Sequence, residues 1–123
     1  MERKDIQNEA DIKTLIDEFY AKALKDELLG PIFIEVAHID LPHHLPILYS
    51  FWEMIILGKQ GYTGQPYPKH IPLGINNTHF ERWLMLFEQT IHENFHGLNA
   101  ELTLQKAKNI GRLFSHKLQE ERA

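Results

Sequence analysis

The 123-residue sequence contains no cysteine, so several kinds of site are impossible. Without thiols the chain can form no disulfide framework, no thiolate zinc site and no cysteine nucleophile. It also lacks a long hydrophobic run, because its longest aliphatic stretch, Met54–Leu57, is far too short to cross a bilayer. The first five residues are polar and contain no apolar signal core. We therefore expect a soluble, cytoplasmic protein with no membrane partner.

Positive charge is also scarce. Thirteen basic and seventeen acidic residues are interspersed and give a formal net charge of −4, so nothing indicates a nucleic-acid partner. Strand patterns are missing as well, since no segment alternates polar and apolar residues between turn signals. Hydrophobic residues make up 43% of the chain, a value typical of globular proteins, and no internal repeat is visible. The sequence predicts one all-α domain covering residues 1–123.

Apolar residues at helical spacing predict four main helices. The first is expected to begin after Asn8 and to end near Leu24, and the second to begin at Asp40 or Leu41 and to end at Gly58. The third is expected to begin at the capping box Thr78–Glu81 and to end at Gly97, and the fourth to begin at Asn99. Pro31 can open a short helix after Gly30. Pro46 must lie in the first turn of the second helix or kink that helix.

A proline-rich stretch, Tyr62–His70, separates the second and third predicted helices. Its prolines remove backbone donors and fix φ, so we expect an anchored loop between two strongly apolar helices. His70 stands at the end of this loop on a stiffened backbone. A loop histidine that faces two aromatic-rich helices suggests a ligand to a group buried between them.

Other histidines allow a different chemistry. His92, Glu93 and His96 match H-E-x-x-H, in which two imidazoles on one helix face bind zinc and the glutamate acts as a general base. Gly97 directly follows and ends the helix, and no strand is available to pair with a peptide substrate. A zinc metalloprotease therefore remains a remote alternative to a solvated helix face.

Three polar residues stand on or beside predicted apolar faces. Tyr20, His44 and Trp83 each carry a polar hydrogen that burial would leave in need of an acceptor. Their ordinary interpretation is structural: two large core residues and a histidine bonded to a carbonyl near a helix start. The alternative is a shared polar ligand between them.

The order and spacing of these motifs resemble the group III truncated haemoglobins over residues 5–118. The resemblance rests on a series of short motifs: Phe19-Tyr20, Gly30-Pro-Ile-Phe33, His44 seven residues before Phe51-Trp52, Tyr62-x-Gly-Gln-Pro-x-x-x-His70, and His79-Phe-Glu-Arg-Trp-Leu84. It implies a two-over-two helical globin that binds one haem b, with His70 as the iron ligand. It also implies that Tyr20, His44 and Trp83 stabilise the gas ligand and control its access. Without cysteine, the haem must be held non-covalently.

Further residues are expected to contact this cofactor. By their position or chemistry these are Phe33, Leu48, Phe51, Trp52 and Phe80 around the porphyrin, and Tyr62, Lys69, His79 and Arg82 near its propionates.

The resemblance implies binding of O₂, NO and CO. Strong hydrogen bonds to O₂ would slow its release, which favours NO dioxygenase, peroxidase-like or low-pressure O₂ chemistry over transport. A gas sensor or store without turnover is the alternative, and a haem-free interaction module is a third. No reductase domain is present, so a catalytic cycle would need an external reductase. We expect a monomer.

Overall fold

The computed structural model describes residues 3–36, 40–60 and 77–122, and it is all-α, as predicted. Within these ranges four long helices and one short π-helix follow each other along the chain: α1 (Glu9–Ala23), η1 (Ile32–Val36), α2 (Leu41–Leu57), α4 (Asn77–Asn94) and α5 (Leu98–Arg122). The described residues contain no strand, and the parallel bridge between Lys4 and Phe95 is isolated. No described helix is both long and apolar enough to span a membrane.

Helix α1 begins where the sequence indicated. The side chain of Asn8 accepts a hydrogen bond from the backbone N–H of Asp11 at 3.0 Å, which satisfies one of the free donors of the first turn. The apolar face predicted from the spacing is buried, with Ile12, Leu15 and Phe19 among its members. Local sequence therefore determines both the start and the inward face of α1.

The segment after α1 forms a short helix, as expected from Pro31. Its geometry is that of the π-helix η1 rather than of an α-helix. The turn before it is tight, because a Cβ placed on Gly30 would lie 2.7 Å from the carbonyl oxygen of Leu24. Only glycine allows the two backbone segments to approach this closely.

Helix α2 confirms its predicted ends. Asp40 precedes the first residue, and Gly58 terminates the helix with a left-handed φ of 69°. The helix continues through Pro46, which lies inside it beyond the first turn, so the carbonyl of Pro42 lacks the N–H that would normally bond to it.

The starts of α4 and α5 correct two predictions. Helix α4 begins at Asn77, so Thr78 lies inside it rather than capping it. Asn99 does not cap α5 but lies in its first turn, and the cap comes from Asp5 near the N-terminus. The Asp5 carboxylate accepts from the N–H groups of Asn99 and Ala100 at 2.9 and 2.8 Å. Gly97, with φ of 143°, leaves room for it, since a Cβ there would lie 2.5 Å from Asp5 Cγ.

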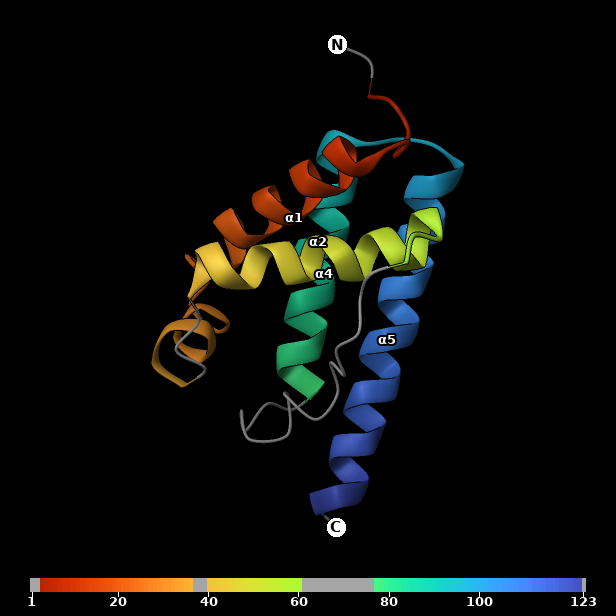
Figure 1. Ribbon diagram of the computed structural model, residues 1–123. Helices are drawn as coiled ribbons and strands as arrows, with labels where there is room; N and C mark the ends of the chain where they lie inside the picture. Colours follow the sequence, from red (N-terminus) through yellow and green to blue (C-terminus); the bar gives the residue numbers. More distant parts are fainter. Residues whose placement is uncertain (1–2, 37–39, 61–76, 123) are drawn as a thin grey trace.

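The four long helices form two crossed layers. Figure 1 shows α2 passing in front of α4 and α5, with α1 beside α2 and α5 running alongside α4. Helix α1 packs against both α2 and α4, and α2 also contacts α5. The core between the layers is rich in large side chains, including Phe19, Trp52 and Phe87. This arrangement confirms the predicted two-over-two sandwich.

Candidate functional site

Tyr20 and His44 meet between the last turns of α1 and the first turn of α2. Tyr20 Oη lies 3.2 Å from His44 Nε2, and the rings are edge-on with centroids 5.8 Å apart. Tyr20 is only 8% exposed, and burial raises the pKa of its hydroxyl well above the ordinary value. The phenol therefore keeps its proton at neutral pH and is available as a hydrogen-bond donor.

The direction of this hydrogen bond depends on the histidine tautomer. If Nε2 of His44 carries the ring proton, the imidazole donates to Tyr20 Oη, and the phenolic hydrogen is free for another acceptor. If Nδ1 carries it, Tyr20 must donate to His44 instead. Only the first arrangement lets Tyr20 donate to a third group while the pair stays together.

Trp83 joins the same cluster through shared aromatic neighbours. Its ring stacks on Phe87 with centroids 5.2 Å apart, and Phe19 meets it edge-on at 6.1 Å. Phe19 also contacts Tyr20 edge-on at 5.3 Å. Phe19 thus packs against both Tyr20 and Trp83. The sequence-predicted trio of Tyr20, His44 and Trp83 comes from three different helices and is gathered around one aromatic core.

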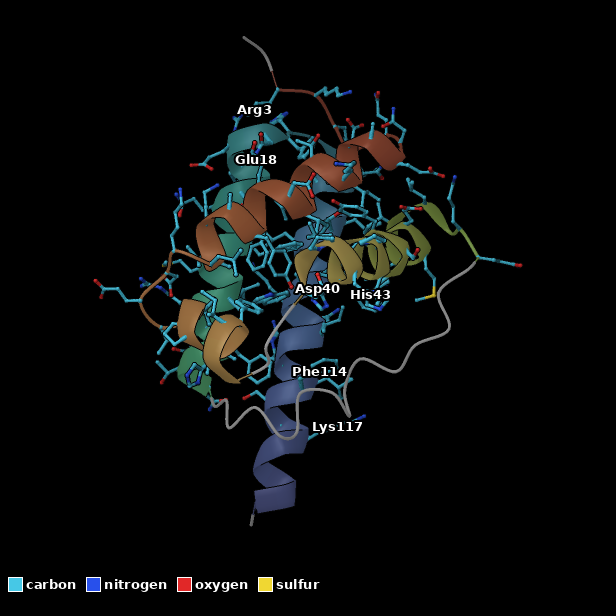
Figure 2. The ribbon with its side chains drawn as sticks, turned by 60° about the vertical axis from the view of Figure 1, so that its left-hand side comes forward. Arg3, Glu18, Asp40, His43, Phe114 and Lys117 are labelled. Carbon is cyan, nitrogen blue, oxygen red and sulfur yellow. The ribbon has the colours of Figure 1, made fainter. Side chains whose placement is uncertain are left out.

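The predicted cofactor contacts on η1 and α2 lie around this cluster. Phe33 packs 5.3 Å from Tyr20, and Leu48 and Phe51 are half-buried at the edge of the core. Trp52 is different, because it is almost fully buried between Phe51 and Phe87, at centroid distances of 5.3 and 5.0 Å. Figure 2 places the start of α2, marked by Asp40 and His43, in front of α5, and Phe114 lies further along α5.

Arg82, near the start of α4, is bonded to Asp26, a residue that the sequence did not single out. His79 and Phe80 are half-buried, whereas Arg82 donates through Nε to Asp26 Oδ1 at 2.7 Å. Arg82, expected as a propionate contact, therefore has a carboxylate partner within the protein. Asp26 stands in a turn with no motif around it, so no sequence signal marked it.

Three predicted residues, Tyr62, Lys69 and His70, lie outside the described residues. Their roles remain predictions.

The zinc alternative fails on geometry. Helix α4 ends at Asn94, and the backbone N–H of His96 bonds to the carbonyl of Lys4, so His96 has left the helix that carries His92. Glu93 is paired with Lys22, with Oε1 and Nζ 2.5 Å apart. Among the residues that the structure describes, no group of three His, Asp or Glu side chains is placed to hold a metal ion.

A two-over-two helical sandwich in which a buried tyrosine contacts a half-buried histidine beside an aromatic core has the architecture of a globin. The comparisons give the same class. Residues 4–118 match the family model of the bacterial-like globins. The group 3 truncated hemoglobin ctb of Campylobacter jejuni is 34% identical over 115 residues, covering 90% of this chain and 91% of that protein. The crystal structure of a group III truncated hemoglobin from the same species superposes with a TM-score of 0.87 at 31% identity, over 95% of each chain.

The chain belongs to the bacterial-like globin family and, within it, to the group III truncated haemoglobins. It is therefore a haem protein that binds diatomic gases such as O₂. The described residues fit such a group. Half-buried apolar side chains of α2 and α4, among them Leu48, Phe51 and Trp83, suit a flat apolar macrocycle, and Tyr20 adds a buried donor beside them.

Proposed function

We propose that the chain binds haem b non-covalently through His70 and uses Tyr20, His44 and Trp83 to stabilise a reactive gas ligand. The observation that carries this proposal is the 3.2 Å contact between Tyr20 Oη and His44 Nε2 inside an aromatic cluster shared with Trp83. When bound, haem supplies an iron centre for reversible gas binding and one-electron chemistry.

The ligand side of the pocket acts through hydrogen bonds. Tyr20 and Trp83 donate to the partly negative oxygen of O₂, and the surrounding aromatic rings exclude water and so strengthen both bonds. A bond of this kind to a charged oxygen contributes about 1.5–3 kcal/mol, which makes release of O₂ slow. Slow release suits reaction with NO or peroxide, or O₂ handling at low pressure, better than transport.

His44 controls access to this pocket. It is half-buried in the first turn of α2, where a side chain can move between the cluster and solvent by changing rotamer. Pro46 restricts the backbone there, so motion of the side chain is the simpler route. With His44 turned inward, Nε2 donates to Tyr20 and leaves the phenolic hydrogen for O₂.

The remaining predicted residues hold the cofactor. Haem would be held by the apolar side chains of Phe33, Leu48, Phe51, Trp52 and Phe80, and Tyr62, Lys69 and His79 would be the partners of its propionates. Arg82 contributes less to binding the propionates, because its Nε is already bonded to Asp26. NO and CO bind at the same position as O₂. The protein acts as a monomer, and an external reductase returns the ferric protein to the ferrous state after each turnover.

Mixing the O₂-loaded protein with NO tests the proposed chemistry. We expect stoichiometric nitrate and ferric protein within the mixing time, and repeated turnover once a reductase is added. Tyr20→Phe is the matched variant, since it keeps the ring and removes only the donor. Ligand exchange without nitrate would contradict the dioxygenase proposal and identify a sensor or store.

A further inference from the structure

Asp26 has a buried side chain that joins the turn after α1 to the start of α4. Its side chain is 5% exposed, and its Oδ2 accepts from the backbone N–H groups of Leu28 and Leu29 at 3.0 Å each. Its Oδ1 accepts from Arg82 Nε at 2.7 Å. Burial raises the pKa of Asp26, but hydrogen bonds from Leu29, Arg82 and Leu28 outweigh it and hold the pKa below its usual value. The carboxylate is therefore ionised at neutral pH.

One side of this contact leads to Tyr20. The bonds to Leu28 and Leu29 fix the turn after α1, and Leu29 is buried in the core. Leu29 also holds the next segment of the chain, because its carbonyl accepts a hydrogen bond from the N–H of Phe33 at 3.2 Å. Phe33 in turn packs against the Tyr20 ring at 5.3 Å. Asp26 thus supports the segment that covers the phenol.

The other side leads to Trp83. Arg82 directly precedes Trp83 in α4, so its bond to Asp26 ties α4 to the turn after α1 at the position next to the indole. If α4 turned or slid, Arg82, whose side chain is 40% exposed, would separate from the Asp26 side chain, which is only 5% exposed. Leaving a largely buried carboxylate without its charged partner is costly, so the contact resists such motion.

We infer that Asp26 and Arg82 are positioning residues, which hold Trp83 of α4 in register with Tyr20 of α1. The consequence for gas ligands rests on the proposed function. Neither residue touches the ligand, and both act through the two donors that do.

A second ion pair, between α1 itself and the far end of α4, gives a control. Lys22 of α1 contacts Glu93 near the other end of α4, with Nζ and Oε1 2.5 Å apart. Glu93 follows Arg82 by 11 positions in the helix, or about 16 Å along its axis. Asp26→Asn and Glu93→Gln each remove one negative charge and keep the side-chain shape. In Asp26→Asn the new amide oxygen can still accept from Leu28 and Leu29, so this variant mainly weakens the link to Arg82.

The first test observes the two indoles directly. The chain has two tryptophans, so a two-dimensional NMR spectrum of the purified ¹⁵N-labelled protein shows two indole N–H signals, assigned with Trp83→Phe. We expect Asp26→Asn to shift the Trp83 signal more than the Trp52 signal, and Glu93→Gln to leave both in place. An unmoved Trp83 signal in Asp26→Asn, or an equal shift in Glu93→Gln, overturns the proposal.

The second test uses the haem-loaded protein. Asp26→Asn should raise the O₂ dissociation rate about fivefold, the change expected when a coupled residue shifts ligand energetics by about 1 kcal/mol. CO dissociation should change less than about twofold, because CO carries less negative charge and depends less on the donors. Arg82→Lys keeps a positive charge that can pair with Asp26, so its O₂ dissociation rate should rise less than that of Arg82→Met.

The two proposals fail in different ways. If the protein binds no haem, the proposed function is wrong, and the indole comparison still decides whether Asp26 positions Trp83. If haem binds but O₂ dissociation in Asp26→Asn matches that of Glu93→Gln, the gas-binding function stands and the positioning role is overturned.

Discussion

The hydroxyl hydrogen of Tyr20 can serve one acceptor at a time, either His44 or a ligand. The 3.2 Å contact between Tyr20 Oη and His44 Nε2 permits both arrangements, and the histidine tautomer selects between them. A change at either residue therefore alters the hydrogen bonds of both. This coupling makes Tyr20 the most informative single residue to change.

Tyr20→Phe should speed O₂ dissociation by about tenfold, because loss of about 1.4 kcal/mol of stabilisation corresponds to that factor. CO dissociation should respond less, as its oxygen carries less negative charge. Trp83→Phe should behave similarly, and the double variant should be non-additive if both donors reach one oxygen. Stopped-flow displacement kinetics measure all three, and small, equal effects on O₂ and CO would leave the polar pocket without support.

At this scale the sequence predicts roles for residues that stand in a motif, and it does not mark Asp26, which stands in none. Tyr20, His44 and Trp83 stood at positions matching the family pattern. In the structure Phe19 contacts both Tyr20 and Trp83, and Tyr20 contacts His44. Asp26 had no such marker, because its partner Arg82 lies 56 residues further along the chain. Only the folded arrangement of the turn after α1 and the start of α4 brings the two together.

Among the elements, α5 depends on a cap supplied from far away in sequence. Asp5→Ala should lower the free energy of unfolding by about 1–2 kcal/mol, because the N–H groups of Asn99 and Ala100 lose their acceptor. Gly97→Ala should cost more, since its Cβ would meet Asp5 and φ is 143°. Urea denaturation measures both, with the exposed Arg112→Ala as a control that should be near neutral.

Local signals predicted the helix ends that depend on neighbouring residues. Asn8 at the start of α1 and Gly58 at the end of α2 act within a few positions of their own helices, so the sequence shows them. The cap of α5 could not be predicted in this way, because Asp5 is separated from Asn99 by 94 residues. The π-helix η1 has no distinctive spacing, and its tight entry at Gly30 becomes visible only when Leu24 is placed beside it.

For the whole molecule, acid should be destabilising through three aspartates. Burial raises the pKa of Asp5, Asp11 and Asp26, but their hydrogen bonds outweigh burial and hold each pKa below the ordinary 3.8. A depressed pKa in the folded state adds stability that is present above the unfolded pKa and lost as pH falls through the folded one. The free energy of unfolding should therefore fall below about pH 4.

Denaturant unfolding at a series of pH values checks this expectation. Asp26→Asn should flatten the acid slope, because one titrating group is gone, whereas Glu93→Gln should change the slope less. An unchanged slope in Asp26→Asn would show that its carboxylate does not take up a proton on unfolding.

The most direct test of the account is the absorption spectrum of the ferrous protein, with and without CO, in wild type and His70→Ala. We predict a wild-type haem spectrum that converts fully on addition of CO. In His70→Ala we predict lost or weakened haem binding, restored when imidazole is added, because the cavity left by the side chain can admit a free ligand. A His70→Ala protein that retained the wild-type spectrum without imidazole would contradict the assignment of His70 and the haem site built on it.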